Sequence, residues 1–181
     1  MNLSLFTATI ITSICLVLVG ALLFWNDNSI SSIIKGLPRS RRFTILAFGI
    51  GSMWFIYKVS QLGVADFGNH RNLLMGIFGV IAVLSYFFVP DFLAVRGVCV
   101  IWLLAATEML SSAFALYDIP SRIFLTIFAY ILIVLSIYLA VAPYRARDFV
   151  EWLFKQDRRA KFLGAVLAAY GLILSIVAFA Y

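Results

Sequence analysis

Six long apolar runs divide this chain, and short polar segments separate them. Each run is close to the roughly 20 residues that an α-helix needs to cross the hydrocarbon core of a bilayer. The runs are continuous and do not alternate apolar with polar residues, which argues against spanning β-strands. The pattern therefore predicts one polytopic membrane domain over residues 1–181, with spans at residues 3–25, 43–62, 73–89, 97–117, 123–142 and 162–181.

Two of the polar segments, residues 26–42 and 143–161, also contain apolar residues at helical spacing. These residues are Ile30, Ile33, Ile34 and Leu37 in the first segment and Phe149, Trp152 and Leu153 in the second. Cations flank both sets, as in helices that lie in the headgroup layer with their apolar side toward the lipid. The expected fold class is an all-α integral membrane protein: a bundle of six transmembrane helices with two short interfacial amphipathic helices.

Composition agrees with a membrane location. Hydrophobic residues make up 64% of the chain and charged residues 12%, whereas soluble domains carry about 25% charged residues. The net charge of +6 could suggest a nucleic-acid partner. However, the cations lie in short loops between apolar runs, which is how membrane proteins set their orientation. We therefore expect the lipid bilayer, and no nucleic acid, as partner.

The distribution of Lys and Arg predicts the orientation. Eleven of the fourteen lie in the segments 26–42, 90–96 and 143–161. By the positive-inside rule these segments face the cytoplasm, so both termini lie outside a bacterial-type inner membrane. The cations expected at the membrane surface are Lys35, Arg39, Arg41, Arg42, Arg145, Arg147, Arg158 and Arg159. They are expected to contact anionic lipids of the inner leaflet, as anchors or, alternatively, as a docking surface for a protein partner.

The two basic segments resemble each other, as SIIKGLPRSRRF and EWLFKQDRRAKF show. Both run from apolar residues and a lysine into a basic cluster and then into a span. A parallel internal repeat and a likeness that follows from similar topology are both open interpretations.

Small residues at helical spacing predict where spans approach closely, because packing rather than hydrophobicity holds helices together in lipid. The candidate pairs are Ala47 with Gly51, Gly76 with Gly79, Gly164 with Ala168, and Ala165 with Ala169.

Glu108 lies near the centre of the fourth apolar run, in the stretch AATEMLSSA. A carboxylate at the centre of a spanning helix costs about 2.5–3.5 kcal/mol on the insertion scale, so we expect it to face the protein interior. Ser111 and Ser112 follow at i+3 and i+4 and extend a polar stripe. Counting along the spans places Lys58 within one helical turn of its depth and Tyr130 near its level.

Three interpretations of Glu108 are open. It pairs with Lys58 as a structural contact, it is a protonated and hydrogen-bonded acid with a packing role, or it binds a proton, cation or substrate during transport. Transporters usually contain several intramembrane polar groups and broken helices. Here Pro90, Pro120 and Pro143 all lie at span ends.

The loop between the second and third spans holds the most polar cluster expected outside, which comprises Asp66, Asn69, His70 and Arg71. One histidine and one aspartate are too few for the four ligands of a structural zinc site, so no metal is expected. A solvated turn is the simplest interpretation, and contact with an outer partner is the alternative.

Recognisable catalytic chemistry is missing from the sequence. It contains no P-loop, GxSxG, HExxH or Rossmann glycine pattern, and Cys15 and Cys99 form no CxxC pair. We therefore expect no cofactor and a non-enzymatic accessory or scaffold subunit that works with other membrane subunits. A small transporter or channel built on Glu108 is one alternative, and a membrane enzyme without a recognisable motif is another.

Overall fold

The computed structural model describes residues 3–25, 28–37, 40–89 and 92–181. Six long helices and two short ones account for most of these residues. The long helices are α1 (Leu5–Trp25), α3 (Arg41–Ser60), α4 (Arg71–Phe88), α5 (Leu93–Ala113), α6 (Ile123–Val141) and α8 (Asp157–Ala178). The short helices are α2 (Asn28–Gly36) and α7 (Tyr144–Leu153), and 3-10 turns lie at η2 (Val64–Asp66), η3 (Gly68–His70) and η4 (Pro120–Arg122).

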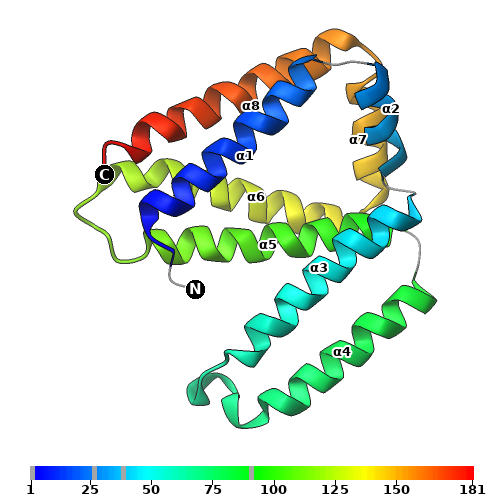
Figure 1. Cartoon of the computed structure of the whole chain (residues 1–181), viewed down its shortest axis with the longest axis vertical. Helices are drawn as coiled ribbons and strands as arrows, with labels where there is room; N and C mark the ends of the chain where they lie inside the picture. The colour runs from blue at the N-terminus through cyan, green and yellow to red at the C-terminus, as the bar shows by residue number, and fades with distance from the viewer. Residues whose placement is uncertain (1–2, 26–27, 38–39, 90–91) are drawn as a thin grey trace.

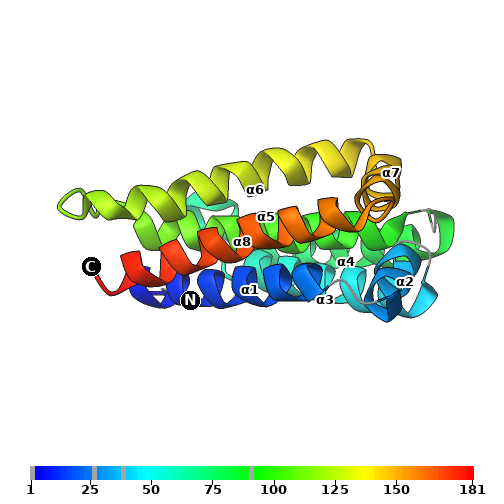
Figure 2. The same cartoon turned by 90° about the horizontal axis from the view of Figure 1, so that it is seen from above.

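All six long helices are long and apolar enough to cross a membrane, which confirms the expected fold class of a multi-pass membrane protein. The long helices run from one end of the molecule to the other, and both chain termini lie at the same end (Figures 1 and 2). The short helices α2 and α7 lie across the opposite end. We call the end with α2 and α7 the basic end and the other the terminal end.

Close backbone contact holds α1 against α8 in an antiparallel pair. A Cβ atom added at Gly164 would lie 2.6 Å from the carbonyl oxygen of Gly20, and one added at Gly20 would lie 2.6 Å from the backbone nitrogen of Ala168. Further along, the Ser13 hydroxyl donates to the carbonyl oxygen of Gly171 at 2.7 Å. Close contacts at small residues and a hydroxyl-to-backbone hydrogen bond therefore hold these two helices together, whereas burial of apolar surface does so in water-soluble bundles.

A second tight pair joins α3 to α5, and here the two helices run parallel. A Cβ at Gly97 would lie 2.5 Å from the backbone nitrogen of Phe48, and one at Gly51 would lie 3.1 Å from the carbonyl oxygen of Gly97. α5 is the central helix, since it also packs against α6 and α1. The α3–α5 register, fixed near the basic end, brings Lys58 level with Glu108 toward the terminal end.

The small-residue prediction is correct for two pairs of helices and wrong for a third. Gly51 and Gly164 do lie at close contacts, but a Cβ at Gly76 or Gly79 would meet nothing within 4 Å. Ala165 and Ala169 are also exposed.

α4 instead contacts α3 through large side chains. The ring of Phe78 lies edge-on to that of Phe55, with 5.0 Å between centroids. No described residue of α4 is buried, and the helix lies at the edge of the molecule beside α3 (Figure 1).

Two helices begin several residues before the spans that hydropathy predicts. The fourth was expected over residues 97–117, but α5 runs from Leu93 to Ala113. Left-handed backbone at Phe92 (φ 55°) precedes the helix, and Ala115 (φ 61°) follows it. Residues other than glycine rarely adopt this backbone conformation, and hydropathy gives no sign of it. The apolar pattern therefore did not reveal where α5 begins and ends. α8 likewise begins with polar residues, at Asp157, before the predicted start of the sixth span at residue 162.

The glycine contacts give a stability prediction. We expect Gly164→Ala to lower the free energy of unfolding by about 1–3 kcal/mol, because the added methyl group meets backbone on α1. Thermal unfolding in a mild detergent measures this. Gly76→Ala is the matched control, since its methyl group enters open space and alanine favours the helix. Equal melting midpoints for both variants would contradict the close approach of α1 and α8.

Candidate functional site

The candidate functional site is an ion pair between α3 and α5. The ammonium of Lys58 contacts a carboxylate oxygen of Glu108. The carboxylate side chain is 11% exposed and the lysine side chain 29%. The parallel register of the two helices produces this contact, since residues of similar depth meet across the interface. The contact that the first interpretation of Glu108 requires is therefore present.

The depth of Glu108 differs from the expectation. Because α5 starts at Leu93 and ends at Ala113, Glu108 lies five residues from the end of the helix, about 7.5 Å along its axis. Lys58 lies two residues before the end of α3 at Ser60. The pair is thus close to the terminal end and not at the centre of the span. A long lysine side chain can keep its charged group near the membrane interface. The free-energy cost of inserting the pair into the bilayer is therefore below that of a charge at the centre of a span.

A small cavity of about 100 Å³ adjoins the pair. Its lining consists of Leu3, Trp54, Tyr57, Lys58 and Glu108. At roughly 30 Å³ for each water, it has room for about three water molecules. Ligand pockets are usually about 300–1,000 Å³. Leu3 also packs on the apolar cluster formed by Leu5, Ala8, Ala113 and Leu125, so the N-terminal segment borders this cavity.

The other residues predicted near Glu108 do not join it. Ser111 is exposed. Ser112 is buried, but its hydroxyl donates to the carbonyl oxygen of Met109 at 2.8 Å within the same helix. Tyr130 lines a different, shallow apolar hollow on α6 with Tyr138. The predicted polar stripe is therefore reduced to the ion pair, with Trp54 and Tyr57 beside it.

The polar cluster of the loop before α4 is solvent-exposed. Asp66, Asn69, His70 and Arg71 all have exposed side chains. Within the described part of the chain, no group of three or more His, Cys, Asp or Glu side chains could hold a metal ion.

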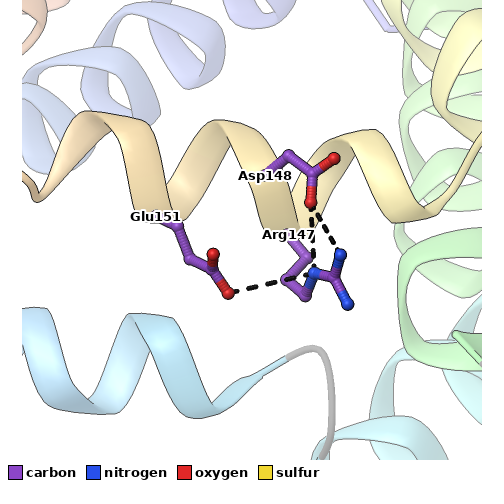
Figure 3. Close-up of polar contacts among 3 residues, drawn as sticks. All are labelled: Arg147, Asp148 and Glu151. Carbon is purple, nitrogen blue, oxygen red and sulfur yellow. Dashed lines mark hydrogen bonds and ion pairs between the residues drawn. The ribbon is translucent and has the colours of Figure 1, made fainter.

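At the basic end, the predicted surface cations have different surroundings. Arg147 donates two hydrogen bonds to one oxygen of Asp148, at 2.9 and 3.1 Å, and lies 3.9 Å from Glu151 (Figure 3). The hydrogen bond to Asp148 raises the pKa of Arg147 above its ordinary value. The guanidinium of Arg145 lies 5.6 Å from the ring centroid of Tyr144. Arg147 is therefore largely compensated by its own helix.

The remaining predicted cations are distributed along this end. Arg41 contacts the hydroxyl of Tyr86 at 3.5 Å, and Arg42 and Arg158 are exposed. Arg39 lies outside the described residues.

Two cations instead lie against aromatic rings at the end of α7. The ammonium of Lys35 is 5.8 Å from the ring centroid of Phe154. The guanidinium of Arg159 is 4.5 Å from the ring of Trp152 and donates to the Trp152 carbonyl oxygen at 3.1 Å. Such placement suits both the ring quadrupole and the negative end of a helix dipole.

Sequence reasoning did not identify Arg122, which caps the central helix. Its guanidinium donates to the carbonyl oxygen of Ala113 at 2.8 Å and lies 4.7 Å from the ring of Tyr117. A cation shortly after an apolar run is a signal for such a cap, but hydropathy does not show that the chain turns back and brings Arg122 to the carbonyl oxygen of Ala113.

The ion pair gives a second stability prediction. We expect Lys58→Met and Glu108→Gln each to lower the free energy of unfolding by about 1–3 kcal/mol, less than the 3–5 kcal/mol of a fully buried pair. The double variant should lose less than the sum, because neither charge is then left alone. Chemical or thermal unfolding of all four proteins measures the coupling. Arg71→Gln removes an exposed cation and is the control. Strict additivity would show that the two groups do not interact.

Comparison with known protein families, with curated proteins and with solved structures finds no match for this chain.

Proposed function

We propose that this protein is a non-enzymatic accessory or scaffold subunit that assembles with other membrane proteins within the bilayer. The observation that carries this proposal is the position of α4. This helix has no described buried residue, yet it is long and apolar enough to span. It packs against α3 at the edge of the molecule, so most of its surface is available to a neighbouring membrane helix.

The Lys58–Glu108 pair has a structural role in this proposal. It joins the terminal ends of α3 and α5, while Gly97 joins the same helices near the basic end. Because these two contacts hold α3 against α5 near both ends, the α3–α4 hairpin extends rigidly from the other helices. A rigid surface loses little conformational entropy on binding, which suits a scaffold.

A transporter or channel is the competing function, and the cavity beside Glu108 is the observation in its favour. A carboxylate with room for a few waters can exchange protons, and Lys58 is partly exposed. Against this, the paired charge and the small volume leave little space for a larger substrate.

The orientation completes the proposal: the basic end faces the cytoplasm, and both termini lie outside a bacterial-type inner membrane. Its support is the charge distribution. Ten described Lys and Arg residues lie at or near the basic end, and Lys58, Arg71 and Arg122 lie toward the terminal end. This is the asymmetry that the positive-inside rule associates with cytoplasmic segments.

Purification from native membranes in a mild detergent tests the subunit proposal. We expect a complex well above the 20.2 kDa of the chain, containing a second protein at fixed stoichiometry by intact-mass measurement. Replacing exposed α4 residues with bulkier ones, as in Gly76→Leu, should release that partner. Gly49→Leu is the matched control, since Gly49 also has open space around it but lies on α3. A lone monomer or homo-oligomer would contradict the heteromeric assembly.

Reconstitution separates the two functions. For a scaffold, proteoliposomes with the wild-type chain and with Glu108→Gln should show the same proton and ion flux as protein-free vesicles. Flux that appears with the wild-type chain and is lost in a stable Glu108→Gln variant would establish transport instead.

Cysteine labelling tests the orientation. In a background with Cys15→Ala and Cys99→Ala, we expect Asn69→Cys to react with an impermeant maleimide added outside the inner membrane. Gln156→Cys at the basic end should react only after permeabilisation. Both positions are exposed, so the reversed pattern would place the basic end outside.

A further inference from the structure

We infer that the turn between α7 and α8 forms a binding site for the phosphodiester headgroup of an anionic phospholipid, with Lys35 and Arg159 as the binding cations. This inference is independent of the proposed subunit function, because it concerns a defined lipid site at the basic end and not the surface of α4.

The site has a fixed base. Leu23, Leu153 and Ala160 form a buried cluster there, and Ile34 and Phe154 pack against it. This cluster joins α1, α2, α7 and α8 in one place. The short helices therefore lie across the ends of the spans (Figures 1 and 2) on packed protein, where lipid headgroups are expected if the long helices cross the bilayer. A cation carried by this base is held in place before any ligand binds.

Both proposed binding cations are positioned but keep donors to spare. Arg159 uses one N–H group on the carbonyl oxygen of Trp152, at 3.1 Å, out of the five that a guanidinium carries. Lys35 lies over the ring of Phe154, and its three ammonium donors make no hydrogen bond with any described residue. Arg147 is different, because its charge is paired with Asp148 and Glu151 on its own helix (Figure 3). Lys35 and Arg159 differ from the other exposed cations of this end because contacts with α7 hold them in place beside the same turn.

The local charge favours an anion. Lys155, Arg158 and Lys161 are exposed around this turn, and Asp157 is the acid among them. Each Lys or Arg near a bilayer surface adds about 1 kcal/mol of attraction to anionic lipid. The excess of cations therefore attracts a headgroup with a net negative charge more strongly than a zwitterionic headgroup, whose own cation is repelled.

Exposed aromatic rings favour a lipid over a soluble anion. Phe149 and Trp152 are stacked, with 5.9 Å between ring centroids, and about half of each side chain is exposed. Such rings settle at the membrane interface, where one side meets apolar chains and the other meets water. Cations beside an exposed aromatic pair match a ligand with an anionic head and an apolar body.

Lipid titration of the purified full chain tests this site. The chain in nonionic detergent is mixed with phosphatidylglycerol or with phosphatidylcholine of the same acyl chains, and bound lipid is counted by native mass measurement. We expect tighter binding of phosphatidylglycerol, weakened by added salt because exposed charges are screened. Lys35→Gln should weaken it roughly five-fold, and Lys35→Gln with Arg159→Gln about 30-fold. Arg71→Gln, which removes a cation toward the terminal end, should change nothing.

Three results would overturn the inference: equal binding of the two lipids, equal loss in Arg71→Gln, or competition by inorganic phosphate as strong as by the lipid. The last would indicate a soluble anion. Lys35→Gln leaves the contacts between Arg159 and Trp152 intact, so it decides the matter even where the double variant does not fold. Size-exclusion elution and the lipid-free melting midpoint identify such a failure.

Discussion

Helices in a bilayer gain little by hiding apolar surface from one another, since lipid tails are as apolar as leucine. Everything that holds this molecule together follows from that constraint. Its long helices meet where side chains are absent, as at Gly20, Gly97 and Gly164, so that backbones approach within van der Waals contact. A few polar contacts supplement these, among them Ser13 with Gly171 and Lys58 with Glu108. Small apolar clusters are buried at each end of the molecule, but many large apolar side chains stay exposed, and no described residue of α4 is buried.

The ion pair depends on the glycine contact between the same two helices. On α3 and α5, close approach at Gly97 sets the parallel register, and that register places Lys58 against Glu108. The carboxylate that the sequence singled out therefore owes its partner to a glycine roughly three turns away. At the basic end, the aromatic rings of α7 and its C-terminus hold two cations in place: Lys35 lies over Phe154 and Arg159 lies over Trp152.

Sequence reasoning predicted what depends on hydropathy and could not predict what depends on backbone conformation. Six spans and two amphipathic helices follow from apolar runs and helical spacing, and Lys58 follows as a candidate partner of Glu108 from depth counting. The start of α5 does not, because a left-handed Phe92 has no hydropathy signal. That shift also misplaced Glu108 at mid-span. Nor could spacing separate the packed Gly164 from the open Gly76, since both have small residues nearby.

The pairing of α1 with α8 has a consequence for how the chain is made. α1 is synthesised well before α8, the helix that it contacts most extensively. Until α8 arrives, Thr9 and Thr12 can satisfy their hydroxyls on their own helix, at the carbonyl oxygens of Leu5 and Ala8. Ser13 bonds across to Gly171, and Gly20 has no backbone to meet. The contacts between α1 and α8 can therefore form only after α8 has been synthesised.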